Sequence, residues 1–573
     1  MTAPVPSAGA PIPDEEQVEL YVRTYRSLLR SSGEIRLQAL ERAHLGMASS
    51  LHPLGSNAEL DSGALLYALH RLPPVVLELE HVCLGQAPDQ LLHYRTSLPA
   101  DWLPVVAPGR RRRWWWNPEL RTLAVALASS SDLDDLVPTL VAMQIEWNKA
   151  HALLRGLEAK EPGDSAHQVS RRLQVTADDW ARLGAVFGAR LPEFVAAVGS
   201  RPMDLGIQLL GGSQVGYARA TREWWRPVGD VLRREGLMDR PLYFVSSNAH
   251  CLVNLLSGVA RKRAGRVGDW VAASGDRELQ LIAAELREKG SRLSPDNFLY
   301  YAARHWFEVH PEEREERARE ERSEGIFHVP SQSGTGIAAQ LIVLDRLQFS
   351  HLDPRLQGSA AAADLAQSPH VILNIQYPLG LGAYHILRQV MEATEHVDGV
   401  YILGKAATLN ADIGDVMVSD VVHDEPSGNT YWLNNCFSFA ELSPFVTSRS
   451  VLDRQRAVSV RSTFLQNRGY LERYYRDAYT VVEMEAGPYL GAVFEAGDSS
   501  RYPDREQVDL TRPPMEVGVI HYASDTPYTQ ARTLGARGLH FEGMEATYAG
   551  ALAIAARILE RCGHTIPRAR VAE

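Results

Sequence analysis

The sequence predicts an α/β protein: a mostly parallel or mixed sheet flanked by helices, preceded by an additional, mainly α-helical N-terminal domain. Two observations support this prediction. In the C-terminal part of the chain, continuous apolar runs alternate with helical patterns, which is typical of strands buried on both faces. In the N-terminal part, apolar residues recur at helical spacing over long stretches.

The composition indicates a globular protein and disfavours several functional classes. The chain has 573 residues, of which 45% are hydrophobic and 23% charged, enough for about three domains. A net charge of −11 disfavours a dedicated nucleic-acid binder. The four cysteines are far apart and form no CxxC pair, which suits a reducing compartment and gives no zinc or disulfide signature. Without a membrane-length apolar run or a signal-peptide pattern, we expect a cytoplasmic location.

The N-terminal half is expected to begin with a disordered, Pro/Ala-rich tail over residues 1–16. A mainly helical domain should follow over residues 17–235. Within it, PGRRRRWWWNPEL at 108–120 is expected to form a loop. Arginine beside tryptophan suits stacking on nucleic-acid bases, but in an acidic chain we favour a structural or subunit-interface role.

Near residue 240 the helical pattern gives way to apolar, strand-like runs, and residues 240–573 are expected to form the α/β domain. Strands are predicted at Leu242–Val245 and in the apolar runs that contain HVILNIQ, GVYILGK, GDVMVSD, TVVEMEA and MEVGVIHYASD. A charged helical insertion is expected around 266–365. Within it, the run at 310–325 indicates a solvated helix with Glu–Arg pairs four residues apart. In sheets of this class ligands bind at the carboxyl ends of the strands, where the polar residues gather.

Two of these strand ends carry carboxylates. The run YTVVEMEAGPYLGAV at 479–493 places Glu483 and Glu485 around Met484 at the end of an apolar strand. Carboxylates are rarely buried unless they are paired or bound to a ligand, so this stretch needs a partner rich in hydroxyl or ammonium donors. A later strand ends in Ser524-Asp525.

Two glycine-containing segments only partly match phosphate-binding patterns. GVYILGKA at 399–406 has the spacing of a phosphate loop, but its middle is a strand and its last residue is Ala406, so we reject that interpretation. PLGLGAYHI at 378–386, which contains Gly382, predicts either a tight strand–helix turn or a loop whose amides face an anion or a sugar.

Taken in order, ILGKAATLNADIGDVMVSD, Met484-Glu485 and Ser524-Asp525 in its SDxP form resemble the purine nucleoside phosphorylase/uridine phosphorylase superfamily. Within it they are most similar to the AMP nucleosidase branch. The resemblance covers roughly residues 240–565 and is weakest across 266–365. It implies a phosphorylase-like domain, a homo-oligomer, a nucleoside or nucleotide as ligand, and no metal or organic cofactor.

The resemblance implies a role for each of these residues. Glu485 would accept hydrogen bonds from the vicinal ribose hydroxyls, and Met484 would lie against the sugar. Asp525, next to Ser524 and with its pKa raised by partial burial, would protonate the departing base. Glu483 would assist or be salt-bridged. The alternatives are a structural Glu–Arg pair for the two glutamates and a helix or turn cap for Asp525.

The chain departs from the phosphorylase pattern around Gly404. Phosphorylases of this family carry an arginine and a serine for phosphate, where this chain has Ile402 and Lys405. Lysine can attract an anion but lacks the arginine fork, which favours water as the nucleophile. Phe437 and Tyr431 are expected either to stack on the base or to pack in the core. Arg388, Arg461 and Arg261–Arg263 are further candidates for a substrate phosphate.

We therefore expect cleavage of the N-glycosidic bond of a purine nucleoside or nucleotide, by hydrolysis rather than phosphorolysis. Two alternatives stay open. One is a non-catalytic nucleotide sensor built on a degenerate phosphorylase-like domain. The other is a phosphorylase in which Lys405 belongs to an altered anion site.

Overall fold

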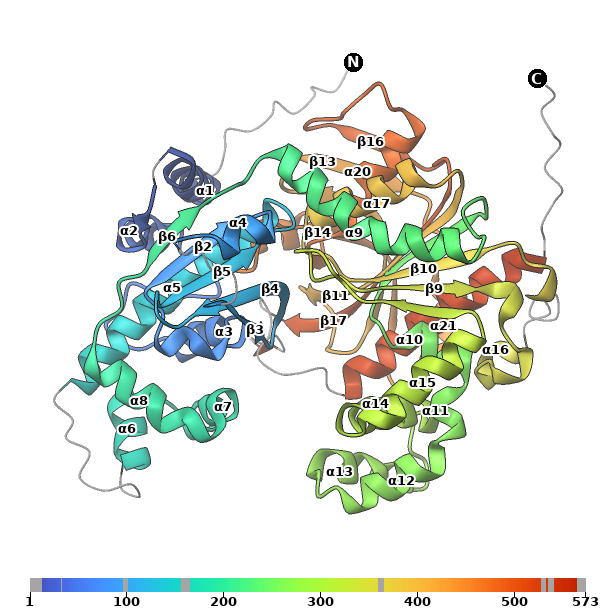
Figure 1. Ribbon diagram of the computed structural model, residues 1–573, viewed down its shortest axis with the longest axis horizontal. Coiled ribbons are helices and arrows are strands. Elements are labelled where there is room, and N and C mark those ends of the chain that lie inside the picture. Colours follow the sequence, from blue (N-terminus) through green and yellow to red (C-terminus); the bar gives the residue numbers. More distant parts are fainter. Residues whose placement is uncertain are drawn as a thin grey trace. The chain divides into compact units, whose positions relative to one another are not determined.

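The computed structural model describes residues 13–31, 33–95, 101–155, 165–358, 365–526, 532–533 and 541–563. The chain divides into two compact units, each with its own sheet (Figure 1). Unit 1 comprises Met1–Ala220, Ser333–Gly336 and Val460–Asp477, and unit 2 comprises the remainder. In the described part of the chain, no helix is both long and apolar enough to cross a membrane.

Unit 1 combines helices with a six-stranded sheet. Its helices are α1 (Pro13–Ser31), α2 (Gln38–Gly46), α3 (Ser62–His70), α4 (Pro88–Leu92), α5 (Ser131–Leu154), α6 (Ser165–Leu173), α7 (Ala177–Phe187), α8 (Leu191–Ser200) and α19 (Arg468–Arg476). Its strands are β1 (Ile35–Arg36), β2 (His81–Gly85), β3 (Leu103–Ala107), β4 (Arg110–Asn117), β5 (Thr122–Ala126) and β6 (Gly206–Leu209). Helix α9 (Gln214–Arg234) contains the boundary between the units.

The sheet of unit 1 is a feature that the sequence did not predict. Its order is β1-β6-β2-β5-β4-β3, and the central strands β6, β2 and β5 are parallel. Helical residues still outnumber strand residues, but strands that we did not predict form the centre of this unit, which we expected to be mainly helical. Most of these strands have five residues or fewer, too short to stand out between long helical patterns. Residues 1–12 of the expected tail lie outside the described residues, and Pro13–Glu16 begin α1.

The Arg/Trp run was wrongly predicted as a loop, because it forms strand β4. Trp114, Trp115 and Trp116 are all buried. Arg112 donates to Asp132 and Asp135, at 2.6 and 2.5 Å, from the same strand. Aromatic residues favour strands, and buried arginines are tolerated once each is paired with a carboxylate. These contacts support the structural role that we favoured for the run.

Unit 2 contains the remaining elements. Its helices are α10 (Cys251–Ser257), α11 (Val259–Lys262), α12 (Ala264–Ala273), α13 (Arg277–Glu285), α14 (Pro295–Val309), α15 (Pro311–Ser323), α16 (Pro354–Gln357), α17 (Gly382–Ala393), α18 (Phe439–Leu442), α20 (Ala486–Gly497) and α21 (Phe541–Gly563). Its strands are β7 (Leu242–Ser247), β8 (Ile326–Val329), β9 (Ala339–Val343), β10 (Val371–Gln376), β11 (Val397–Thr408), β12 (Val416–Asp424), β13 (Asn429–Leu433), β14 (Val451–Ser459), β15 (Val481–Glu483), β16 (Gln507–Leu510), β17 (Glu516–Thr526) and β18 (Arg532–Thr533).

These strands form one mixed, twelve-stranded sheet, which confirms the predicted α/β class and each predicted strand. The path runs β16-β13-β12-β14-β15-β11-β7-β10-β9-β8, and β17 pairs with both β11 and β12. Strands β11, β15, β14, β12 and β17 therefore close into a ring of pairings. Strand β11 takes part in the ring and also pairs with β7, so it joins the ring to the open part of the sheet.

Helices cover both faces of this sheet (Figure 1). Alternate residues of one strand enter different cores: Tyr243 and Val245 join the core beneath α10, α14 and α21, whereas Leu242 and Phe244 join the core beneath α9, α17 and α20. This period of two is what a strand buried on both faces requires. The stretch 266–365 contributes the expected helices α12–α16, but it also contains the unpredicted short strands β8 and β9.

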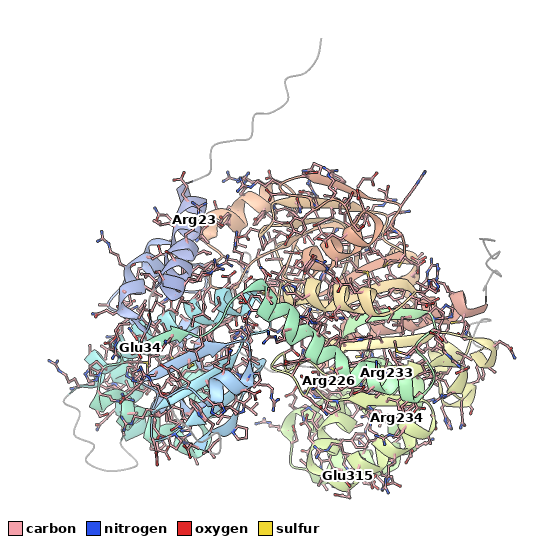
Figure 2. All side chains as sticks on the ribbon, turned by 45° about the horizontal axis from the view of Figure 1, so that its top comes forward. Arg23, Glu34, Arg226, Arg233, Arg234 and Glu315 are labelled. Carbon is pink, nitrogen blue, oxygen red and sulfur yellow. The ribbon has the colours of Figure 1, made fainter. Side chains whose placement is uncertain are left out.

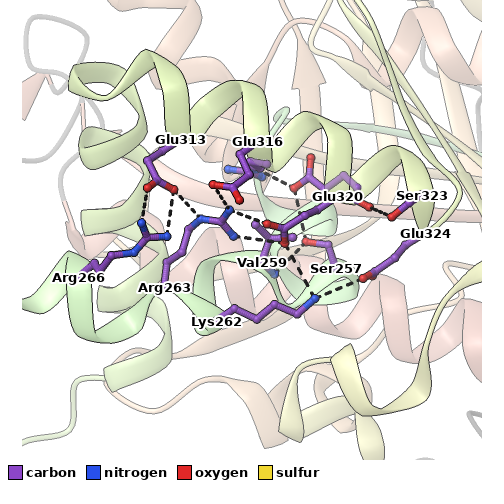
Figure 3. A network of polar contacts seen from close by, with 12 residues as sticks. Ser257, Val259, Lys262, Arg263, Arg266, Glu313, Glu316, Glu320, Ser323 and Glu324 are labelled. Carbon is purple, nitrogen blue, oxygen red and sulfur yellow. Dashed lines mark hydrogen bonds and ion pairs between the residues drawn. The ribbon is translucent and has the colours of Figure 1, made fainter.

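The charged run at 310–325 contains helix α15, as predicted, but only part of it is solvated. Glu321 is fully buried and pairs with Arg317 at 2.6 Å. Figure 3 shows the glutamates of α15 facing Arg263 and Arg266, which come from the preceding helices. Arg314, Arg319 and Arg322 of α15 are exposed, as are Arg226, Arg233 and Arg234 on α9 (Figure 2 labels these last three).

Candidate active site

The strand register brings the two acidic strand ends to either side of β11. Ala407 of β11 is the partner of Val482 in β15 and also of Asp525 in β17. Neighbouring strands lie about 4.8 Å apart, so the backbones of Val482 and Asp525 are separated by about 10 Å. Strand β15 is antiparallel to β11 and β17 is parallel to it, so from the shared level of Ala407 the segment Glu483–Glu485 continues toward Gly404 and His521, whereas β17 continues past Asp525 in the opposite direction.

Glu483 is buried and holds the start of helix α20 in place. Its Oε2 accepts the backbone amide hydrogens of Glu485 and Ala486 at 2.6 and 2.7 Å. The hydroxyl of Ser459 donates to Oε1 of Glu483 and accepts the amide hydrogen of Gly487 at 2.7 Å. Helix N-termini leave backbone amides without intrahelical partners, so this pair of side chains caps α20.

His521 supports the same carboxylate from strand β17. It is 1% exposed, and its Nε2 lies 3.7 Å from Oε2 of Glu483. Burial disfavours the charged carboxylate, but His521, Ser459 and the amide of Ala486 outweigh burial and hold the pKa of Glu483 below its usual value. Gly404 faces the same ring, because a Cβ at that position would lie 3.5 Å from Cδ2 of His521.

Glu485 and Met484, which follow Glu483 in the chain, are half-buried. Glu485 is the N-cap residue of α20, but its side chain makes no capping hydrogen bond. Burial raises the pKa of Tyr489 well above its ordinary value, and the nearby charge of Glu485 raises it further. Glu483 thus fixes the backbone of Glu485 through the amide of that residue, while the side chain of Glu485 stays partly accessible.

Asp525 is half-buried near the end of β17, beside the buried Ser524. The Ser524 hydroxyl lies 2.7 Å from Oδ2 of Asp525 and 3.1 Å from the carbonyl oxygen of Ala406. Ser524 therefore links the aspartate to β11. Residues 527–531 lie outside the described residues, so the description of this side of the site ends at Thr526.

The remaining predicted site residues lie in different surroundings. Lys405 is exposed on β11, next to Gly404. Gly382 is the first residue of α17, which follows β10, and β10 is separated from β11 by β7. Phe437 is 2% exposed, packs against Tyr401 with ring centroids 5.8 Å apart, and joins the core beneath α21. Its position matches the core-packing alternative rather than base stacking, and Tyr431, also 2% exposed, joins the opposite core.

The other cations considered for a substrate phosphate make structural contacts. Arg388 pairs with Glu392 at 2.8 Å, and Arg461 pairs with Glu19 in unit 1 at 2.8 Å. Arg261 donates to the carbonyl oxygen of Leu352 at 2.6 Å. Arg263 is engaged by the glutamates of α15. Lys405 is therefore the cation of the predicted set that lies on the central strand β11 itself.

Two cavities lie in other parts of unit 2. One, of about 470 Å³, lies near the amino ends of β11 and β17 and includes Glu516 and Arg557. The other, of about 440 Å³, is lined by the α13–α14 connection and Arg449. Neither includes Glu485 or Asp525 among its described lining residues. In the described part of the chain, no cluster of three or more His, Cys, Asp or Glu side chains is arranged to hold a metal ion.

A family of unknown function (DUF6909) matches residues 37–560. The chain belongs to this family. No curated protein matches the chain. As a DUF6909 member, the protein has no activity assigned by its family.

Several solved structures are similar to part of this DUF6909 chain. A putative methylthioadenosine nucleosidase from Weissella paramesenteroides is 14% identical, with 41% of this chain and 89% of that chain covered and a TM-score of 0.26. An S-adenosylhomocysteine nucleosidase from Streptococcus pyogenes is 11% identical, with coverages of 56% and 98% and a TM-score of 0.29. A uridine phosphorylase from Schistosoma mansoni is 13% identical, with coverages of 33% and 71% and a TM-score of 0.24.

Two residues of the cluster were missed at the sequence level. Ser459 ends β14 in an ordinary serine-containing run and gave no signal. His521 is a polar residue within the apolar strand GVIHYA, which is a recognisable sign of a paired buried group. The described site thus contains two half-buried carboxylates, Glu485 after β15 and Asp525 near the end of β17.

Proposed function

We propose that this DUF6909 protein cleaves the N-glycosidic bond of a purine nucleoside or nucleotide. The single observation that supports the proposal is that β15, which leads into Glu485, and β17, which carries Asp525, both pair with β11 at Ala407. Two strand spacings separate the backbones of Val482 and Asp525 by about 10 Å, and in the proposal the two carboxylates bind opposite ends of one nucleoside. The ordered motifs of the sequence favour the same ligand class.

The proposed division of labour follows from the surroundings of each carboxylate. Glu485 accepts hydrogen bonds from the ribose hydroxyls, and its negative charge stabilises the oxocarbenium-like sugar as the bond breaks. Asp525, in its protonated form, donates a proton to the leaving purine. Ser524 orients Asp525 through the 2.7 Å contact with Oδ2. Met484 provides an apolar surface for the sugar.

We further propose water as the nucleophile. Ile402 and Lys405 occupy the positions where the phosphorylases that the sequence resembles bind phosphate, and an apolar side chain cannot hold a phosphate dianion. Ile402 is buried in the core beneath α20, which supports this argument. The exposed Lys405 favours phosphorolysis as the second candidate, because an ammonium group can attract phosphate as a point charge.

Incubation of the full chain with a panel of nucleosides and nucleotides, followed by mass spectrometry of the products, tests these proposals. Parallel samples contain or lack inorganic phosphate. Release of free base in both samples supports hydrolysis. Release only with phosphate, together with a pentose 1-phosphate product, supports phosphorolysis. Binding of a nucleotide without any release supports the sensor alternative and contradicts catalysis.

A further inference from the structure

The connection between β14 and β15 belongs to unit 1, although both strands belong to unit 2. Ser459 is the last residue of β14, and the following segment, Val460–Asp477, is part of unit 1. The chain re-enters unit 2 at Ala478 and forms β15. Parallel neighbouring strands need a crossover connection, whose helix ordinarily covers the sheet to which the strands belong. Here the crossover helix is α19, and it lies against α1 of unit 1.

Several contacts within unit 1 fix this crossover segment. Arg461 pairs with Glu19 at 2.8 Å. The backbone amide and the hydroxyl of Ser50 both donate to the carbonyl oxygen of Gln466, at 2.8 and 3.0 Å. Ser49 forms an isolated antiparallel bridge with Asn467. The segment is therefore bound along its length by backbone and side-chain contacts.

Phe464 is the apolar anchor of the segment. It is 1% exposed and packs edge-on against Tyr67, with ring centroids 5.1 Å apart. The rings of His44 and His52 lie 6.0 and 6.3 Å away. Truncation of a buried phenylalanine with aromatic neighbours is strongly destabilising. This anchor is strong enough to hold the crossover in one position.

The two strands that the crossover segment connects both carry residues of the candidate site. Ser459 precedes it and bonds to Glu483, which ends β15. Glu483 in turn accepts the amides of Glu485 and Ala486. A shift of the segment would therefore move Ser459 and Glu483 relative to each other and release the amides that fix Glu485.

We infer that unit 1 serves to position the proposed ribose-binding carboxylate, with Phe464 and Arg461 as positioning residues that act through the β14–β15 crossover. The inference assigns a task to the N-terminal half of the chain. It rests on the proposed site, because it concerns the backbone of Glu485. Its primary test needs no substrate, so its failure is distinguishable from failure of the proposed function.

Hydrogen–deuterium exchange of the full chain, read by mass spectrometry, measures the amides in question. We compare wild type with Phe464→Leu and Arg461→Gln, and use Phe194→Leu as the matched control. Phe194 is also 1% exposed in unit 1, but it packs with Trp147 and Phe187, away from the crossover segment. Thermal unfolding shows whether each variant is folded. If Phe464→Leu does not fold, the comparison between Arg461→Gln and the control still tests the inference.

The expected result is specific to the peptide that covers residues 481–490. Phe464→Leu should raise exchange there at least tenfold and Arg461→Gln several-fold, whereas Phe194→Leu should leave it within twofold of wild type. Exchange in β10, over residues 371–376, should not change in any variant. Equal exchange of the 481–490 peptide in the Phe464 variant and the control would overturn the inference, whatever reaction the protein catalyses.

Discussion

Oε2 of Glu483 accepts the backbone amide hydrogen of Glu485 at 2.6 Å, so the first glutamate of the VVEMEAG run fixes the backbone of the second. The two carboxylates thus have different tasks despite standing two residues apart. Glu483 is buried and saturated by Ser459, His521 and the amides of α20, whereas the side chain of Glu485 is partly accessible. This division explains why an apolar strand ends in two acids.

Replacing Glu483 by alanine should destabilise unit 2 strongly. The change leaves His521 and the first amides of α20 without their buried acceptor, and removing one member of a buried pair typically costs about 3–5 kcal/mol. Urea unfolding measures the change in free energy. Glu392→Ala is the control, because that glutamate forms an exposed pair with Arg388 and should cost less than about 1 kcal/mol. Similar losses in the two variants would contradict the capping role of Glu483.

Glu485→Gln should reduce turnover in a way that depends on the sugar. If the carboxylate accepts hydrogen bonds from both vicinal hydroxyls, its loss should lower kcat/KM for a ribonucleoside by about 100-fold, which corresponds to about 2.7 kcal/mol. The 2′,3′-dideoxy analogue cannot make those bonds, so its slower turnover should change by less than about threefold. Steady-state kinetics on both substrates provide the comparison. Equal penalties on the two substrates would place Glu485 elsewhere in the mechanism.

Unit 1 should lose stability as the pH falls below about 6.5. Four buried side chains of unit 1 are linked by hydrogen bonds. The ring of His44 lies 3.2 Å from the hydroxyl of Tyr21 and 3.1 Å from the ring of His52, and His52 lies 2.7 Å from the carboxylate of Glu146, which also pairs with Lys149. Burial, and then the neighbouring His52, hold the pKa of His44 well below its ordinary 6.5. The folded state therefore binds fewer protons than the unfolded state, so the stabilising contribution is present above pH 6.5 and is lost as the pH falls toward the folded pKa.

Thermal unfolding between pH 7.5 and 5 measures this dependence. His44→Gln keeps a polar side chain at the position but removes the titration, so its stability should fall less steeply over the same interval. Parallel pH profiles for wild type and variant would show that another group governs the acid response of unit 1.

Among the ion pairs between α15 and Arg263 or Arg266, burial should decide how much each pair contributes to the free energy of unfolding. Arg263 and Arg266 both contact Glu313 (Figure 3), but their side chains are 4% and 57% exposed. Arg263→Gln removes a buried cation that pairs with the partly buried carboxylates of Glu313 and Glu320, and should cost about 3 kcal/mol or more. Arg266→Gln should cost less than about 1 kcal/mol, because Arg266 is exposed and Glu313 keeps its pair with Arg263. Equal losses in chemical unfolding would contradict this account.

The strands of unit 2 that we predicted were recognisable because each contains an apolar run bounded by polar or glycine-containing turns, as in Val371–Gln376, whereas β14 and β16 contain several charged or polar residues and were not predicted. The sheet of unit 1 was not, since β2 and β6 are short and β4 presents arginines and tryptophans rather than an aliphatic run. The closing of five strands into a ring also escaped prediction. It depends on pairings such as Ala407 with Asp525, which lie far apart in the sequence and leave no local signal.

Of the candidate site, the sequence predicted that the acidic residues after two apolar strands belong to one site, and the register pairs both strands, β15 and β17, with Ala407 of β11. The partners of Glu483 were beyond sequence reasoning, because Ser459 and His521 come from two other strands and meet it only in the folded chain. For Phe437 the sequence left base stacking and core packing open, and the residue packs in the core.

The most direct test of the central claim is the release of free purine in phosphate-free buffer by wild type and by Asp525→Asn, with nucleotide binding measured for both proteins. The account predicts that wild type releases the base and that the variant binds with similar affinity but releases it at least 100-fold more slowly, because asparagine cannot donate the proton that the leaving purine needs. Undiminished release by the Asp525→Asn protein, or tight binding by wild type with no release at all, would contradict it.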